Sequence, residues 1–151
     1  APAPPAAGRA LTGPSVAGPA ASAERDRVLA PGGQILLAWN TLDVNVDPWL
    51  LLLSRLMLSG DVHNPGFYPT YTAPWVLDRE LRLTWEHELT PEQLHLLMHT
   101  RSYWLRNGET IHERMTHNLD WYLYEHLGFH PGQKLKIPYR TDAFVLVREA
   151  D

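Results

Sequence analysis

Polar side chains border two apolar segments of the chain. Asn40 follows the apolar run 34–39, and Tyr139 and Arg140 precede the apolar run 141–148. Amide, phenol and guanidinium groups orient small ligands in binding sites, and a guanidinium pairs with a carboxylate through two parallel hydrogen bonds. These three residues are therefore candidates for substrate binding. The structural alternative is that Asn40 ends its strand by bonding to loop backbone and that Arg140 is solvated.

The chain has eight histidines and no cysteine, which raises the question of a metal site. His95 and His99 stand four residues apart on one predicted helix face, a spacing that a metal ion can bridge, but the glutamate of an H-E-x-x-H motif is missing. His112 and His117 are five apart and share no helix face. His87 lies on the apolar side of its predicted strand, which favours a hydrogen-bonded core residue. We expect no metal site, and disulfides and cysteine nucleophiles are excluded.

Composition narrows the function classes. The chain has 151 residues, 44% of them hydrophobic, and this predicts one globular domain. Its net charge of -4 and the absence of a Lys/Arg run argue against nucleic acid as a partner. The longest apolar stretch, residues 49–58, is too short to span a bilayer and contains Arg55. We expect no membrane partner and a cytoplasmic location.

The first part of the chain is divided by proline and glycine. Residues 1–20 are rich in Ala, Pro and Gly and predict a loose segment, whereas residues 21–151 carry the periodic patterns of a folded domain. A short helix over 22–29 precedes a Pro-Gly-Gly turn and an apolar strand over 34–39. Asp47 predicts the cap of a helix that runs to about residue 59.

The second part of the chain begins after a long loop, residues 60–75, that we expect to be mobile or to act as a lid. A strand over 81–89 alternates apolar and polar residues, which predicts one core face and a position at a sheet edge. Thr90 opens a capping box for a helix to about residue 105, and Thr110 predicts a second capping box for a helix ending near residue 128. The strand over 141–148 is apolar on both faces, which predicts a central position.

Three stretches carry a resemblance to a known family. They are "RVLAPGGQILLAWN" (27–40), "LTPEQLHLLMHTRSYW" (89–104) and "KIPYRTDAFVLVRE" (136–149). Together they resemble the carboxyl-terminal half of a class I S-adenosylmethionine-dependent methyltransferase, of the methyltransferase type 11-like group that includes relatives of trans-aconitate methyltransferase. The resemblance covers residues 21–151. It implies an α/β, partial Rossmann-like methyltransferase fold with a mixed sheet ordered 3-2-1-4-5-7-6. The chain's strands would be five, six and seven, with an antiparallel seventh strand between the other two.

The resemblance also implies where ligands bind. In open α/β sheets they lie beyond the carboxyl ends of the parallel strands, where several polar residues would converge on one rim. These are Asn40, Glu88, Thr90, Tyr139, Arg140 and Thr141. Arg101, Ser102 and Tyr103 match a TRSY motif of the group and serve either a substrate pocket or helix-end packing. Methyl transfer needs mainly alignment of the reactants, and the sequence identifies no catalytic residue.

One part of the family pattern is missing. The cofactor S-adenosyl-L-methionine is held in the complete fold by a glycine-rich loop after the first strand, but Gly8, Gly13 and Gly18 stand among prolines with no strand before them. We therefore expect the substrate-side portion of a small-molecule methyltransferase that does not bind the cofactor alone, and its status as an enzyme stays open.

Two alternatives remain. One is a non-catalytic pseudoenzyme remnant, and the other is a binding module for a small molecule or a protein, with the loop 60–75 as a lid. In either case the strand 34–39 would have one unpaired edge, which predicts self-association or pairing with a complementing amino-terminal half.

Overall fold

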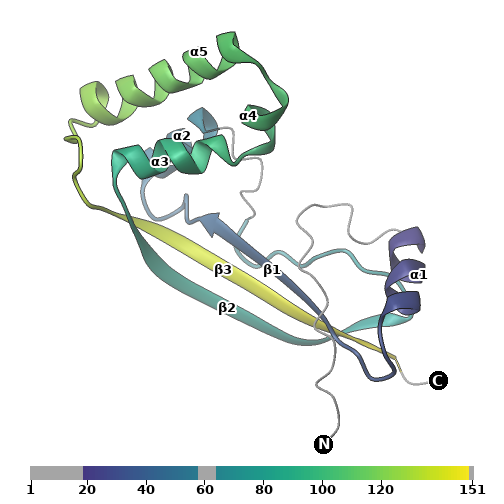
Figure 1. Ribbon diagram of the computed structural model, residues 1–151. Coiled ribbons are helices and arrows are strands. Elements are labelled where there is room, and N and C mark those ends of the chain that lie inside the picture. Colours follow the sequence, from purple (N-terminus) through teal and green to yellow (C-terminus); the bar gives the residue numbers. More distant parts are fainter. Residues whose placement is uncertain (1–18, 58–63, 150–151) are drawn as a thin grey trace, which may run out of the picture. The chain divides into compact units, whose positions relative to one another are not determined.

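The computed structural model describes residues 19–57 and 64–149 (Figure 1). The predicted loose segment 1–20 lies almost wholly outside these residues, and so do the expected end of the helix at residue 59 and the start of the loop 60–75. The described residues fall into two compact units. Unit 1 comprises residues 19–40, 64–83 and 140–149, and unit 2 comprises residues 41–57 and 84–139. Because each unit combines segments that are distant in sequence, this division is not apparent from composition.

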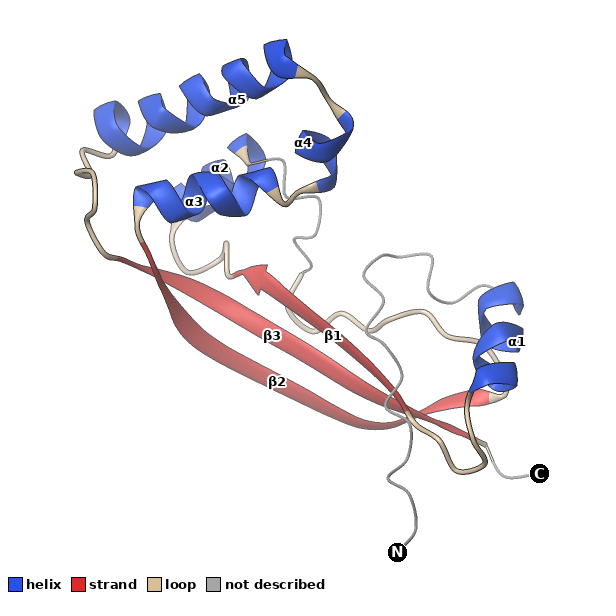
Figure 2. Cartoon of the chain, viewed as in Figure 1, coloured by secondary structure: helices blue, strands red, loops and turns tan. Residues whose placement is uncertain are grey.

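A three-stranded antiparallel sheet runs through the chain (Figure 2). It consists of β1 (Ile35–Leu42), β2 (Trp75–Leu89) and β3 (Leu135–Arg148), in the order β1-β3-β2. The predictions of a central last strand and an edge second strand are confirmed. All three strands are longer than predicted, because pairing recruits polar residues as well. In β2 and β3, for example, Glu86 pairs with Lys136 at 3.7 Å.

The helices of unit 2 begin at signals that the sequence carries. α2 (Pro48–Leu56) is capped by Asp47, whose carboxylate accepts from the Trp49 backbone N–H at 3.4 Å. α3 (Pro91–His99) has the complete capping box of Thr90 and Gln93. Both predicted caps are confirmed. Such caps satisfy backbone N–H groups that have no partner within the helix.

Two helix predictions are wrong. The helix expected from Thr90 to about residue 105 is broken, because the Thr100 side chain bonds to the Leu97 carbonyl at 2.7 Å and Arg101 is extended. A separate short helix follows, α4 (Ser102–Arg106). The second capping box is also absent: α5 (Glu109–Asp120) has Gly108 at its cap position with no side-chain hydrogen bond. It continues into a π-helical turn, η2 (Trp121–His126).

Unit 2 has an apolar core formed by its helices and its strand segments. Tyr122 of η2 is fully buried in it, and its hydroxyl donates to the Trp49 carbonyl of α2 at 2.7 Å. The largest buried residues come from α2 and its C-cap, α3, α5 and η2, and they belong to one cluster with Ile137 of β3. They are Leu50, Leu53, Met57, Leu94, Met98, Leu119 and Leu123.

Unit 1 has a smaller core, made mainly by strand residues. Trp39, Phe67 and Phe144 meet edge to face, with ring centroids 5.4 to 5.9 Å apart. Phe67 belongs to the described part of the loop that was expected to be mobile or a lid, and it packs into this core. α1 (Pro19–Val28) joins the same unit through a 2.8 Å hydrogen bond between the Ser22 and Thr72 hydroxyls.

The sheet segment of unit 1 has one covered face and one open face. Arg82 bonds to Asp142 on the covered face, so the alternate residues of β2 point the other way. Leu81 and Leu83 lie there and are exposed, as is Leu36 of β1, at 49%. The prediction that residues 81, 83 and 85 of β2 form a core face is therefore wrong. In unit 1, β2 buries Trp75, and Arg82 is partly buried on the covered face because the buried carboxylate of Asp142 binds it.

Candidate functional site

The structure brings Asn40 and Thr141 together. The Thr141 hydroxyl donates to the Asn40 side-chain oxygen at 2.6 Å, between the neighbouring strands β1 and β3. Both residues lie inside their strands, since β1 continues to Leu42 and β3 begins at Leu135. Neither ends a strand, so neither the predicted rim position nor the strand-ending alternative describes them. Asn40 is exposed, on the open face.

Arg140 is not at the mouth of a site. It is only 7% exposed, and its Nε donates to Asp142 Oδ2 at 3.0 Å. The carboxylate of Asp142 is fully buried, and its other oxygen accepts from Arg82 Nη1 at 3.0 Å. The expected substrate-facing position is thus corrected, and so is the solvated alternative. Burial of Asp142 explains the difference, because a carboxylate in a core requires charged donors.

Arg82 contacts both the Asp142 carboxylate and the aromatic residues of unit 1. Its guanidinium lies over the rings of Tyr68 and Phe144, at 5.0 and 4.9 Å from their centroids, and donates to the Phe67 carbonyl at 2.7 Å. Burial alone lowers the pKa of Arg82, but the hydrogen bonds to Asp142 and Glu80 outweigh it and raise the pKa above its ordinary value. The contacts of this cluster are internal to unit 1 and hold its strands together.

Tyr139 offers a different kind of polar group. It is 5% exposed in unit 2, and its hydroxyl has no hydrogen-bond partner among the described residues. The rings of Trp85 and His87 each lie 5.1 Å from the Tyr139 ring. Burial raises the pKa of the Tyr139 hydroxyl, and the positive charge of Arg101 acts in the opposite direction.

His87 shares this environment. Its Nδ1 is buried and also has no hydrogen-bond partner within the described part of the chain, so the predicted hydrogen bonding of this core-side residue is not observed at that nitrogen. Leaving a buried polar atom unpaired costs about 1 to 3 kcal/mol, so the Tyr139 and His87 atoms, like Thr41 Oγ1, are groups of unit 2 that a polar partner would stabilise.

The structure places the predicted TRSY residues at the start of α4. Arg101 precedes α4, and its positive charge acts to lower the pKa of the Tyr139 hydroxyl. Tyr103 packs against the unit 2 core, and its carbonyl accepts from the Asn107 side chain at 2.6 Å, which is helix-end packing. Ser102 is exposed at the start of α4.

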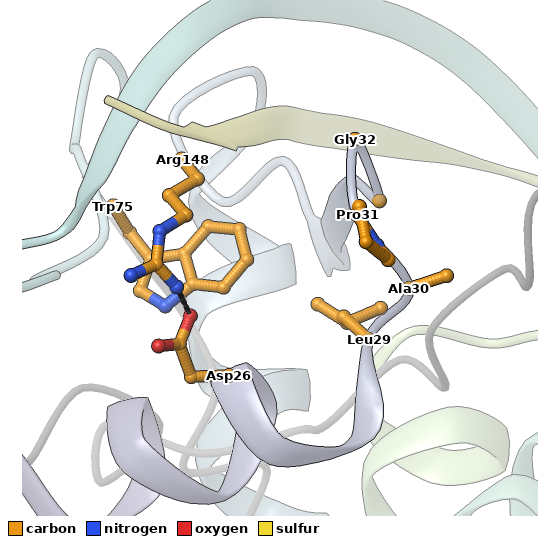
Figure 3. Close-up of a pocket in the computed structure, with 8 residues that line it drawn as sticks. Asp26, Leu29, Ala30, Pro31, Gly32, Trp75 and Arg148 are labelled. Carbon is orange, nitrogen blue, oxygen red and sulfur yellow. Dashed lines mark hydrogen bonds and ion pairs between the residues drawn. The ribbon is translucent and has the colours of Figure 1, made fainter. Parts of the chain in front are cut away.

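Unit 1 contains a cavity of about 290 Å³ that involves none of the predicted site residues (Figure 3). Figure 3 shows Asp26, Trp75 and Arg148 on one side of the cavity, facing Leu29 and Pro31. An ion pair joins Asp26 to Arg148. From the sequence, this region is predicted only as a turn. The Pro-Gly-Gly motif before β1 indicates that turn but does not indicate a cavity.

The described residues do not fit the expected cofactor. A cofactor-binding loop follows a strand and opens a helix, so that backbone N–H groups point at the ligand. Gly32 and Gly33 instead follow α1 and lead into β1. No group of three or more His, Asp or Glu side chains that could hold a metal ion is present in the described ranges.

Comparison with known proteins gives no assignment. No protein-family model and no curated protein sequence matches the chain. None of the helices in the described ranges combines the length and apolar character needed to cross a bilayer.

Proposed function

We propose that this chain is the substrate-side, carboxyl-terminal portion of a class I S-adenosylmethionine-dependent methyltransferase that acts on a small molecule. The order β1-β3-β2, with an antiparallel last strand between the other two, carries the proposal. Sequential strands are neighbours in about two-thirds of cases, so insertion of the last strand is informative. In the resembled fold, strands five, seven and six have this order.

The proposal assigns the cofactor to a complementing half. Two features of unit 1 support a missing neighbour: β1 pairs with β3 and lies at the edge of the described sheet, and the open face exposes Leu36, Leu81 and Leu83. An apolar edge strand recruits a further strand, and an exposed apolar face recruits a covering layer. The complementing half would supply both, and self-association of the chain is the competing outcome. A cytoplasmic location belongs to the same proposal.

For the acceptor substrate, we assign Tyr139 and Arg101 of unit 2 as binding residues. The unpaired hydroxyl of Tyr139 can donate to an acceptor oxygen, and Arg101 adds positive charge near it. Arg140 is left out of the assignment, because its guanidinium binds the buried carboxylate of Asp142. Alignment of the reactants is the main requirement of methyl transfer, so no general base is assigned.

Calorimetry with S-adenosylmethionine tests the proposal first. We expect no saturable binding to the isolated chain below about 1 mM, because the described residues contain no glycine-rich loop between a strand and a helix. The second step co-expresses the chain with the amino-terminal half of a complete type 11-like methyltransferase. A stable complex that releases S-adenosylhomocysteine in the presence of a small-molecule acceptor panel is the expected result. Micromolar cofactor binding by the isolated chain would contradict the assignment of cofactor binding to a complementing half.

One observation favours the alternative of a small-molecule binding module. The cavity of unit 1 lies where β1 begins, whereas ligands of the resembled fold bind beyond the carboxyl ends of such strands. A ligand in this cavity would therefore be independent of methyl transfer.

A further inference from the structure

We propose that the cavity of unit 1 binds a small carboxylate with a compact apolar body, such as an aromatic or branched monocarboxylic acid. The site is formed by α1, the turn that follows it, Trp75 of β2 and Arg148 of β3. This inference is independent of the methyltransferase proposal, because it uses none of the residues assigned there.

A buried donor points to an acceptor on the ligand. Trp75 is 3% exposed, and its indole Nε1–H is buried with no hydrogen-bond partner among the described residues. Indole nitrogen is a donor only, so its partner must bring an oxygen atom or another acceptor. A buried N–H that stays unpaired is destabilising, and a ligand oxygen would relieve that cost.

A cation defines the charge of the ligand. The guanidinium of Arg148 lines the same cavity and lies on the same side as the Trp75 indole in Figure 3. A ligand carboxylate that displaces Asp26 has two oxygens, so one can accept from Arg148 and the other from the Trp75 Nε1–H, which is buried beside Asp26 in Figure 3. A neutral carbonyl would satisfy the indole but would gain no charge interaction with the arginine.

The opposite wall defines the remainder of the ligand. Leu29 and Pro31 are apolar and lie across the cavity from the indole ring, and Ala30 also lines this wall. Gly32 has φ of +77° and no side chain that would narrow the cavity at the turn. The volume of about 290 Å³ is at the lower end of the range for ligand sites, so the apolar body must be small.

Asp26 competes with the ligand for the guanidinium of Arg148. Its carboxylate pairs with Arg148 and lies on the same side of the cavity (Figure 3). A ligand carboxylate would replace Asp26 on the guanidinium. This exchange is feasible because the Asp26–Arg148 pair is partly exposed to solvent, where ion pairs are weak. Asp26 is therefore a competitor of the ligand, and its removal should strengthen binding.

Titration of the full chain with sodium benzoate, followed by the indole N–H resonance of Trp75, tests the proposal. We expect a saturable shift of that resonance with a Kd between about 10 µM and 1 mM. Arg148→Gln should weaken binding at least about tenfold, which removal of one charged hydrogen bond accounts for. Asp26→Asn should strengthen it severalfold. Arg25→Gln, on α1 but outside the cavity, is the matched control and should change nothing.

The opposite effects of the two variants separate binding from misfolding, because loss of structure cannot tighten a ligand. Absence of a shift at the Trp75 resonance up to about 10 mM benzoate overturns the proposal. It is also overturned if Asp26→Asn weakens binding, or if tetramethylammonium chloride produces the saturable shift, since either result identifies a cation site centred on Asp26.

Discussion

The fully buried carboxylate of Asp142 accepts a hydrogen bond of 3.0 Å from Arg82 on the neighbouring strand. Arg140 donates to the other oxygen of the same carboxylate. Asp142→Asn should therefore destabilise the chain by about 3 kcal/mol or more, because it leaves buried positive charge without its counter-charge. Urea denaturation measures this. Asp78→Asn, which removes an exposed ion pair with Arg79, is the control and should cost less than about 1 kcal/mol. Equal effects of the two variants would contradict a structural role for the Asp142 cluster.

Asn40 and Arg140 should differ sharply on substitution. Arg140→Ala should lower the free energy of unfolding by about 3 to 5 kcal/mol, because it leaves the Asp142 carboxylate with one charged partner fewer in the core. Asn40→Ala removes an exposed side chain and should cost less than about 1 kcal/mol. Denaturation midpoints of the two variants measure this difference in the free energy of unfolding. An Arg140→Ala protein as stable as the parent would restore Arg140 as a ligand-binding residue.

Tyr139 and Tyr122 form a matched pair for hydroxyl removal. Tyr122→Phe should destabilise the chain by about 1 to 3 kcal/mol, because the partly buried Trp49 carbonyl loses its 2.7 Å donor. Tyr139→Phe should be neutral or stabilising, because the Tyr139 hydroxyl has no partner among the described residues. If Tyr139→Phe proves as costly as Tyr122→Phe, the hydroxyl is already bonded and cannot be assigned to the acceptor.

The edge of β1 should promote association. Leu36 lies on this strand and on the open face, so Leu36→Lys should reduce dimerisation or aggregation of the purified chain. Sedimentation velocity at increasing concentration gives the measurement. Leu96→Lys, at an exposed position of α3, controls for the added charge. Slow exchange of the β1 amides that point away from β3, in a dilute monomeric sample, would show instead that the edge is covered within the chain.

Unit 2 should lose stability at mildly acidic pH. Trp104 stacks between His99 and His112, with ring centroids 4.0 and 3.8 Å apart. Burial lowers the pKa of His99 from its ordinary value of 6.5, and the nearby His95 and His112 add to the shift. The unfolded chain then binds a proton more readily than the folded one. This destabilisation is absent well above pH 6.5 and grows as the pH falls through 6.5 toward the lowered folded-state pKa.

The measurement for this pH effect is the urea midpoint between about pH 8 and pH 5. His99→Gln should reduce the loss of stability below the ordinary histidine pKa. His130→Gln, at an exposed position, should leave the pH dependence as it is. A His99→Gln profile that follows the parent chain would place the pH sensitivity elsewhere.

Predictions of the fold succeeded where a signal is contained in a few consecutive residues. The Asp47 cap and the Thr90 capping box were predicted because a helix start needs only its own side chains and backbone. The central position of β3 was predicted from its apolar residues on both faces, and the position is confirmed although only alternate residues of β3 are buried. The extra length of each strand was not predicted, because pairing with a neighbour extends a strand beyond its apolar residues.

For the candidate site, the sequence by itself determined which polar residues flank the apolar runs, whereas the pairing of Asn40 with Thr141 depends on the register of β1 against β3. Only the tertiary structure decided that Arg140 is buried, because the cause is Asp142, which in sequence looks like an ordinary polar residue of an apolar strand. The cavity beside Trp75 likewise combines residues of α1, β2 and β3. The pattern of apolar and polar residues within one segment indicates which of its faces is exposed to water. Burial of a charge depends instead on partners that only folding brings within hydrogen-bond distance.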